Sequence, residues 1–229
     1  MTTSLLNSLL RALLRWGAAL VFCLPLRHRS HFWARACGML FPLLLLAQLL
    51  DPLAQSTTLW QQQLLLLVLY ISFFALLGGM IYLCTDINKK GALYCAVWSL
   101  LIAQCAYESW CFLELQFTRY GHPLNMASPW AVLVQLLSGA VFFAAVYILL
   151  ARQLPYKGEY NIGPRQLFSA FFIGILFMVQ AAVLDNARAE HTPLSLTVTI
   201  LIGQFYFITL LYFQSELFKK SAMEKEMSE

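Results

Sequence analysis

Charged residues are scarce in this sequence. Asp, Glu, Lys and Arg make up 11% of the 229 residues, whereas apolar residues make up 60%. A typical soluble domain has roughly 25% charged and about 45–50% apolar residues. A soluble fold of this size could not bury so much apolar surface, so the composition excludes an ordinary water-soluble domain. We therefore expect the lipid bilayer to surround one membrane domain.

Motifs of catalysis and metal binding are also lacking. The sequence contains no Walker motif, no GxSxG elbow, no HExxH helix and no glycine-rich dinucleotide turn. Its six cysteines form no CxxC pair and lie mostly in apolar stretches, which favours small buried side chains over a zinc site or disulfide framework. We expect no metal, no cofactor and no nucleic-acid partner, and no motif identifies an enzyme.

Long apolar stretches are what the sequence does contain. A helix needs about 20 mainly apolar residues to cross a bilayer. Short joints with Pro, Gly, Asn or Asp, which interrupt helices, separate the stretches. Six stretches meet the requirement: 32–50, 64–83, 92–115, 130–151, 166–184 and 194–213.

A seventh, weaker stretch lies at 5–26 and carries Arg11 and Arg15. It is compatible with a span whose arginines lie near the outer interface, or with an amphipathic helix on the membrane surface. We favour the span. The predicted fold is an all-α polytopic membrane helix bundle with six or seven transmembrane helices.

The distribution of basic residues predicts the orientation. Eleven of the 15 Lys and Arg residues lie in the joints 27–35, 84–91 and 152–165 and in the C-terminal tail, all on one side of the predicted topology. The alternate joints hold only Arg119 and Arg188. Because cytoplasmic loops carry an excess of Lys and Arg, we expect a multi-pass protein of the cell membrane with a cytoplasmic C-terminus.

Polar residues inside the apolar stretches are the candidate functional residues. A charge within the hydrocarbon is costly, so Glu108 is a candidate by default. In the predicted orientation Glu108 and the glutamines gather in the outer half or the middle of the bilayer, where they could line a pocket open to the outside. The alternative is that the glutamines only hydrogen-bond between helices. The candidate ligand-binding residues are Gln104, Glu108, Gln135, Gln180 and Gln204.

The last apolar stretch continues into a polar segment without Pro or Gly. Glu216 and Lys220 are spaced i,i+4, a pattern that supports an exposed helix. Residues 1–214 thus form the predicted bundle, and 215–229 begin a cytoplasmic signalling helix. The alternative is a frayed charged tail. The candidate output residues are Gln214, Leu217, Lys220 and Met223.

Three segments carry a resemblance to a known family. They are LRHRSHFWAR at 26–35, KKGALY at 89–94 with AQCAYE at 103–108, and FQSELFKKSAMEKE at 213–226. With them the chain resembles the N-terminal membrane sensor region of Gram-positive, clostridial-type sensor histidine kinases with a GHKL-type ATPase domain, similar in layout to peptide-pheromone receptors. These 229 residues include neither the phosphoacceptor helix nor the ATPase domain of that family.

The resemblance implies a function in two-component signal transduction. A receptor domain of this kind would bind an extracellular ligand and pass a conformational signal through its last helix to a cytoplasmic histidine kinase. The implied ligand is a secreted peptide or small amphiphile, and the implied assembly is a homodimer. The alternative is a small membrane transporter, or the substrate-binding subunit of one, with Glu108 as a proton or cation site. An intramembrane enzyme ranks last.

Overall fold

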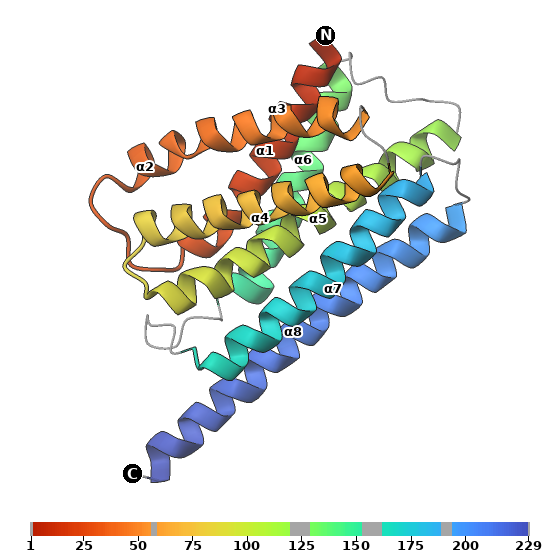
Figure 1. Ribbon diagram of the computed structural model, residues 1–229. Helices are drawn as coiled ribbons and strands as arrows, with labels where there is room; N and C mark the ends of the chain where they lie inside the picture. Colours follow the sequence, from red (N-terminus) through yellow and green to blue (C-terminus); the bar gives the residue numbers. More distant parts are fainter. Residues whose placement is uncertain (1, 56–58, 120–128, 153–161, 189–193, 229) are drawn as a thin grey trace.

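The computed structural model describes residues 2–55, 59–119, 129–152, 162–188 and 194–228. Within these ranges every regular element is a helix, which confirms the all-α prediction. The elements form one bundle (Figure 1). They are α1 (Thr2–Cys23), α2 (Phe32–Gly38), α3 (Leu40–Gln55), α4 (Leu59–Cys84), α5 (Lys89–Arg119), α6 (Pro129–Val146), the π-helical turn η1 (Tyr147–Ala151), α7 (Pro164–Arg188) and α8 (Leu194–Ser228).

Four stretches of these helices are long and apolar enough to cross a membrane. They are Phe32–Leu49, Leu67–Cys84, Lys89–Glu114 and Trp130–Leu149, and each overlaps a predicted span. Shorter apolar helical stretches occur at Pro164–Phe177 and Leu201–Gln214. The count of six or seven spans stays a prediction.

The predicted helix at 32–50 is broken once. α2 ends at Gly38, Met39 forms a turn, and α3 begins at Leu40. Pro42 lies four residues after Gly38 and has no N–H to donate to the Gly38 carbonyl, so the helical hydrogen-bond pattern is interrupted there. The structure therefore divides this stretch into two helices.

α5 lies at the centre of the bundle and packs against α1, α4, α6, α7 and α8. Trp98, Leu101, Ile102 and Cys105 of α5 are fully buried. Apolar side chains of this kind pack closely against the neighbouring helices.

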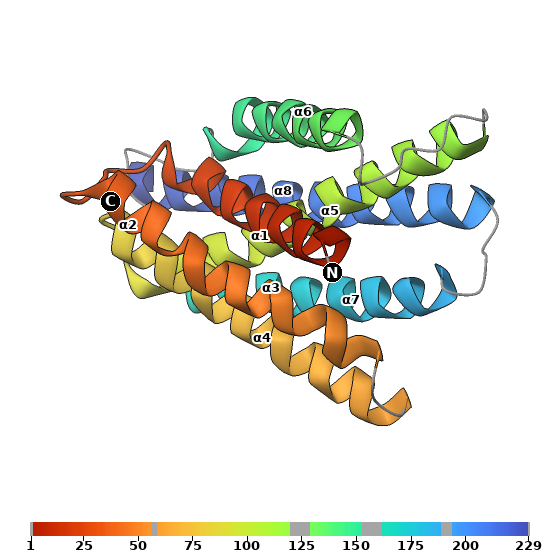
Figure 2. The same ribbon diagram turned by 90° about the horizontal axis from the view of Figure 1, so that it is seen from above.

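α1 lies inside the bundle. It packs against α3, α4, α5 and α6, and Ala18, Ala19 and Phe22 are fully buried. Seen from above, α6 lies on one side of α1 and α4 on the other (Figure 2). That this stretch crosses the membrane as a seventh span stays a prediction.

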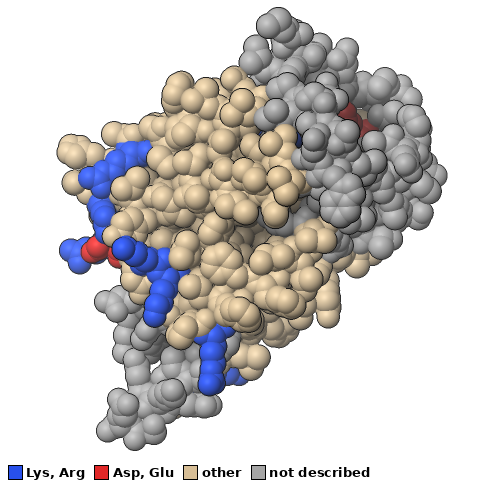
Figure 3. All heavy atoms as spheres, in the orientation of Figure 1, with Lys and Arg blue, Asp and Glu red and all other residues tan. Residues whose placement is uncertain are grey.

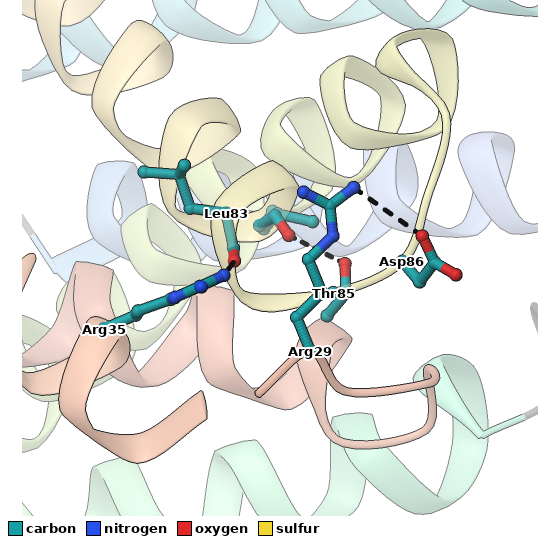
Figure 4. Close-up of polar contacts among 6 residues, drawn as sticks. Arg29, Arg35, Leu83, Thr85 and Asp86 are labelled. Atoms are coloured by element: carbon teal, nitrogen blue, oxygen red, sulfur yellow. Dashed lines mark hydrogen bonds and ion pairs between the residues drawn. The ribbon is translucent and has the colours of Figure 1, made fainter. Parts of the chain in front are cut away.

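Among the described residues, Lys and Arg side chains gather at the end of the bundle where the α1–α2 and α4–α5 loops lie, on the left of Figure 3. There the α1–α2 loop pairs with the α4–α5 loop. The Arg29 N–H donates to the Cys84 carbonyl at 3.0 Å, and the Asp86 N–H donates to the Arg27 carbonyl at 2.9 Å. The side chains of Arg29 and Asp86 lie 3.6 Å apart (Figure 4). Arg35 donates to the Leu83 carbonyl at 2.8 Å. We call this end the basic end.

Candidate functional site

The carboxylate predicted from the sequence is buried beside a glutamine. Glu108 is 1% exposed and Gln104 is 7% exposed, one helical turn apart on α5. The Gln104 amide nitrogen donates to Glu108 Oε1 at 2.8 Å. A buried carboxyl group needs such hydrogen bonds because desolvation of a charge is costly. The structure thus brings these two candidate residues together.

Two arginines of α1 contact aromatic side chains of neighbouring helices, and Arg11 does so beside Glu108. Arg11 donates to the Tyr107 hydroxyl at 3.2 Å, and its guanidinium lies 5.1 Å from the centroid of the Tyr107 ring. The Arg15 guanidinium lies 4.0 Å from the centroid of the Phe73 ring on α4. Both positions are cation–π contacts within the bundle. Both arginines thus contact aromatic rings of neighbouring helices, while their place near the outer interface stays a prediction.

Arg11 and Arg15 are not among the ligand-binding residues predicted from the sequence. Their i,i+4 spacing on an apolar helix nevertheless puts both on one face of α1. An intramembrane arginine usually faces the bundle interior and finds a partner there. That rule indicates a partner inside the bundle for Arg11, but it does not identify Tyr107 of α5 as that partner.

Helix contacts give the level of the remaining glutamines along the bundle axis. Gly139 of α6 lies against Leu14 of α1. Gln135 is one turn further from the basic end than Gly139, so its backbone is about level with Arg11. Arg11 in turn contacts Tyr107, the residue before Glu108. Gln135 is 4% exposed.

Gln204 and Gln180 are level with each other, because the Phe177 ring of α7 meets the Phe207 ring of α8 at 6.0 Å and each glutamine lies three residues further from the basic end. Gly174 of α7 lies against Val97 of α5, and Gln180 lies six residues further from the basic end than Gly174, so both glutamines are also level with about Gln104. The backbones of all the predicted ligand-binding residues thus fall within about 6 Å along the axis. Gln180 lies on α7, but its side chain is outside the described ones.

The side chain of Gln204 points into the bundle and is 1% exposed. Its neighbour Phe205 meets Phe142 of α6, and Phe207 meets Phe177 of α7. Because successive helical residues turn by about 100°, Gln204 points between α6 and α7, where α5 lies. We call Arg11, Gln104, Glu108, Gln135 and Gln204 the polar cluster.

Part of the polar cluster has no hydrogen-bond partner. Among the described residues, Oε1 and Nε2 of Gln204 and Oε1 of Gln135 are buried without one. The indole nitrogen of Trp110, next but one to Glu108, is in the same state. Each such group costs about 1–3 kcal/mol, and native proteins contain few of them. The cluster can therefore accept and donate further hydrogen bonds.

The chemistry available to the cluster is binding. Among the described residues, no group of three His, Cys, Asp or Glu side chains could hold a metal ion. Glu108 and Arg11 provide charge, the glutamines provide amides, and Tyr107 provides a hydroxyl. These groups suit recognition of a polar group in an apolar surrounding.

The last helix runs from the polar cluster to the basic end and continues beyond the bundle there. α8 has 35 residues and is about 52 Å long. Its C-terminal part extends beyond the other helices (Figure 1). Gln214 donates to the Ser169 hydroxyl of α7, while Leu217 is 68% exposed and Lys220 and Met223 are exposed as well.

Comparisons of the chain with protein-family models, with curated proteins and with solved structures found no match. The resemblance to the membrane region of sensor kinases therefore stays a prediction, based on the sequence segments that carry it.

Proposed function

We propose that this chain is a membrane sensory domain. Its polar cluster would bind a ligand that enters from the outer side, and α8 would pass the resulting change to a cytoplasmic histidine kinase output. The observation that carries the proposal is the continuity of α8. One helix holds the buried, unpartnered Gln204 in the cluster and runs without a break to Ser228.

The proposed topology follows from the basic end. Six or seven helices span the membrane in this proposal, and the Lys and Arg residues of the basic end face the cytoplasm. The polar cluster then lies in the outer half of the bilayer. Arg11 lies 12 residues before Cys23, the last residue of α1, which is about 18 Å from the basic end.

The signal in this proposal is a shift between two packings of α8. A ligand shifts such an equilibrium only as far as its affinities for the two states differ. Changing the ratio from 1:99 to 99:1 needs about 5.5 kcal/mol of differential binding. Hydrogen bonds to Gln204 in only one of the two packings would contribute part of that difference. Homodimerisation, implied by the resemblance, would bring together the C-terminal parts of two α8 helices, residues 214–228, which we call the α8 exit.

Hydrogen–deuterium exchange of the protein in lipid nanodiscs tests this proposal. Glu108→Gln replaces the carboxyl group of the cluster by an amide of nearly the same shape. We expect the variant to change amide exchange between Gln214 and Ser228, about 15 Å or more from the mutated level. Thr209→Val is the matched control, because Thr209 is exposed on α8 and bonds only the carbonyl of Phe205 within its own helix.

Unchanged exchange after residue 214 in Glu108→Gln, together with altered exchange near Gln104, would contradict a relay through α8.

The buried carboxyl of Glu108 favours the transporter as the second candidate, since such groups mark proton paths. A proton flux in proteoliposomes that Glu108→Gln abolishes would favour transport over sensing.

A further inference from the structure

The unpartnered atoms of the polar cluster share one chemical property, which is that none belongs to a charged group. They are the amide oxygen and nitrogen of Gln204 and the amide oxygen of Gln135. The unpartnered indole nitrogen of Trp110, two residues after Glu108, is also uncharged. The charged members of the cluster already have partners. Glu108 accepts from Gln104, and Arg11 donates to Tyr107.

Because the charged groups have partners and the uncharged groups do not, the cluster restricts the charge of the ligand group that it can bind. A charged ligand group would need an opposite charge inside the bundle, and Glu108 and Arg11 would have to give up existing contacts to supply it. A neutral ligand group needs only the hydrogen-bond capacity that is unfilled. The cluster therefore favours an uncharged group at the position next to Gln204.

The geometry of Gln204 narrows the choice further. Its Oε1 accepts and its Nε2 donates, side by side on one planar amide, and both are buried without a partner. A complementary group must present a donor and an acceptor side by side. A trans peptide bond points its N–H and C=O in opposite directions and cannot do so. A primary carboxamide can.

We infer that the polar cluster recognises a primary carboxamide group on its ligand, paired with the side-chain amide of Gln204. The chemical class is a neutral amphiphile, or a peptide that carries an amidated end or an Asn or Gln side chain. This inference rests on the proposed receptor function and names the ligand group for the same site. Arg11 then keeps its bond from α1 to Tyr107 of α5, Glu108 keeps its bond to Gln104, and neither contacts the ligand.

Titration with matched six-carbon probes tests the inference. Hexanamide carries the carboxamide, N,N-dimethylhexanamide keeps the acceptor without the donor, and hexanoate carries a charge. Binding to the full chain in nanodiscs is measured by tryptophan fluorescence, since Trp110 is one of the unpartnered groups. We expect saturable binding of hexanamide and at least about tenfold weaker binding of the other two, the loss typical of a missing or mismatched hydrogen bond.

Gln204→Met should raise the dissociation constant of hexanamide about tenfold, and the control Thr209→Val should leave it unchanged. Gln135→Met is the second variant in case Gln204→Met fails to fold. Equal affinities for the three probes, no saturable hexanamide binding, or unchanged binding in Gln204→Met would each overturn the inference. The receptor function fails separately, through unchanged exchange of the α8 exit in Glu108→Gln.

Discussion

Replacing Gln204 by methionine should stabilise the protein in the absence of ligand. Methionine has nearly the shape and helix propensity of glutamine, so the packing against α5 and the helix itself are preserved. The substitution removes an amide that is 1% exposed and has no partner for either polar atom. A buried group of this kind costs about 1–3 kcal/mol, so we expect the unfolding free energy to rise by about that amount.

Thermal unfolding in detergent, followed by circular dichroism, measures this change. For a chain of this length 1 kcal/mol corresponds to about 2–4 °C in Tm. The predicted increase in Tm depends on the absence of a hydrogen-bond partner for Gln204. A glutamine that stabilised the bundle by hydrogen bonds between helices would instead contribute about 0.6–2 kcal/mol, and its loss would lower Tm.

Thr209→Val is the control for general effects of a more apolar α8. A decrease in Tm for Gln204→Met with an unchanged Tm for Thr209→Val would refute the reasoning, because Gln204 would then hold a structural partner.

Three further substitutions test the packing and the basic end. Gly174→Ala should lower Tm, since a Cβ there would lie 3.0 Å from Cγ1 of the buried, β-branched Val97, whose rotamer is fixed in a helix. Gly78→Ala should instead raise the unfolding free energy by about 0.5–1 kcal/mol, because its nearest atom would lie 3.6 Å away and alanine favours the helix. Asp86→Asn should cost less than about 1 kcal/mol, and salt should reduce the effect, because the Arg29–Asp86 pair at 3.6 Å is partly exposed to solvent. A large, salt-independent loss would contradict the last prediction.

The helices were predictable because their signal is local. Long apolar stretches and the Pro and Gly residues between them fix where helices begin and end to within a few residues, as for α4 and α5. The break at Met39 was also present in the sequence, in the spacing of Gly38 and Pro42, but a hydropathy pattern does not register the loss of one N–H. The number of spans depends on the surrounding lipid, which composition alone does not settle.

The candidate site was predictable only in part. Helical spacing pairs Gln104 with Glu108 within a single helix, and the structure contains that hydrogen bond. The place of Arg11 beside Tyr107 depends on how α1 packs against α5, which no pattern within either helix determines. The unpartnered state of Gln204 likewise depends on the neighbours that α5, α6 and α7 provide.

The coupling of the polar cluster to the α8 exit is the central claim, and a distance measurement tests it most directly. Nitroxide labels on unnatural amino acids at Lys89 and Met223, both exposed, leave the six native cysteines unmodified. Pulsed electron paramagnetic resonance then gives the distances between the start of α5 and the exit of α8. We predict that Glu108→Gln and Gln204→Met shift this distance distribution in nanodiscs while Thr209→Val does not. Superimposable distributions for all the proteins would contradict the account.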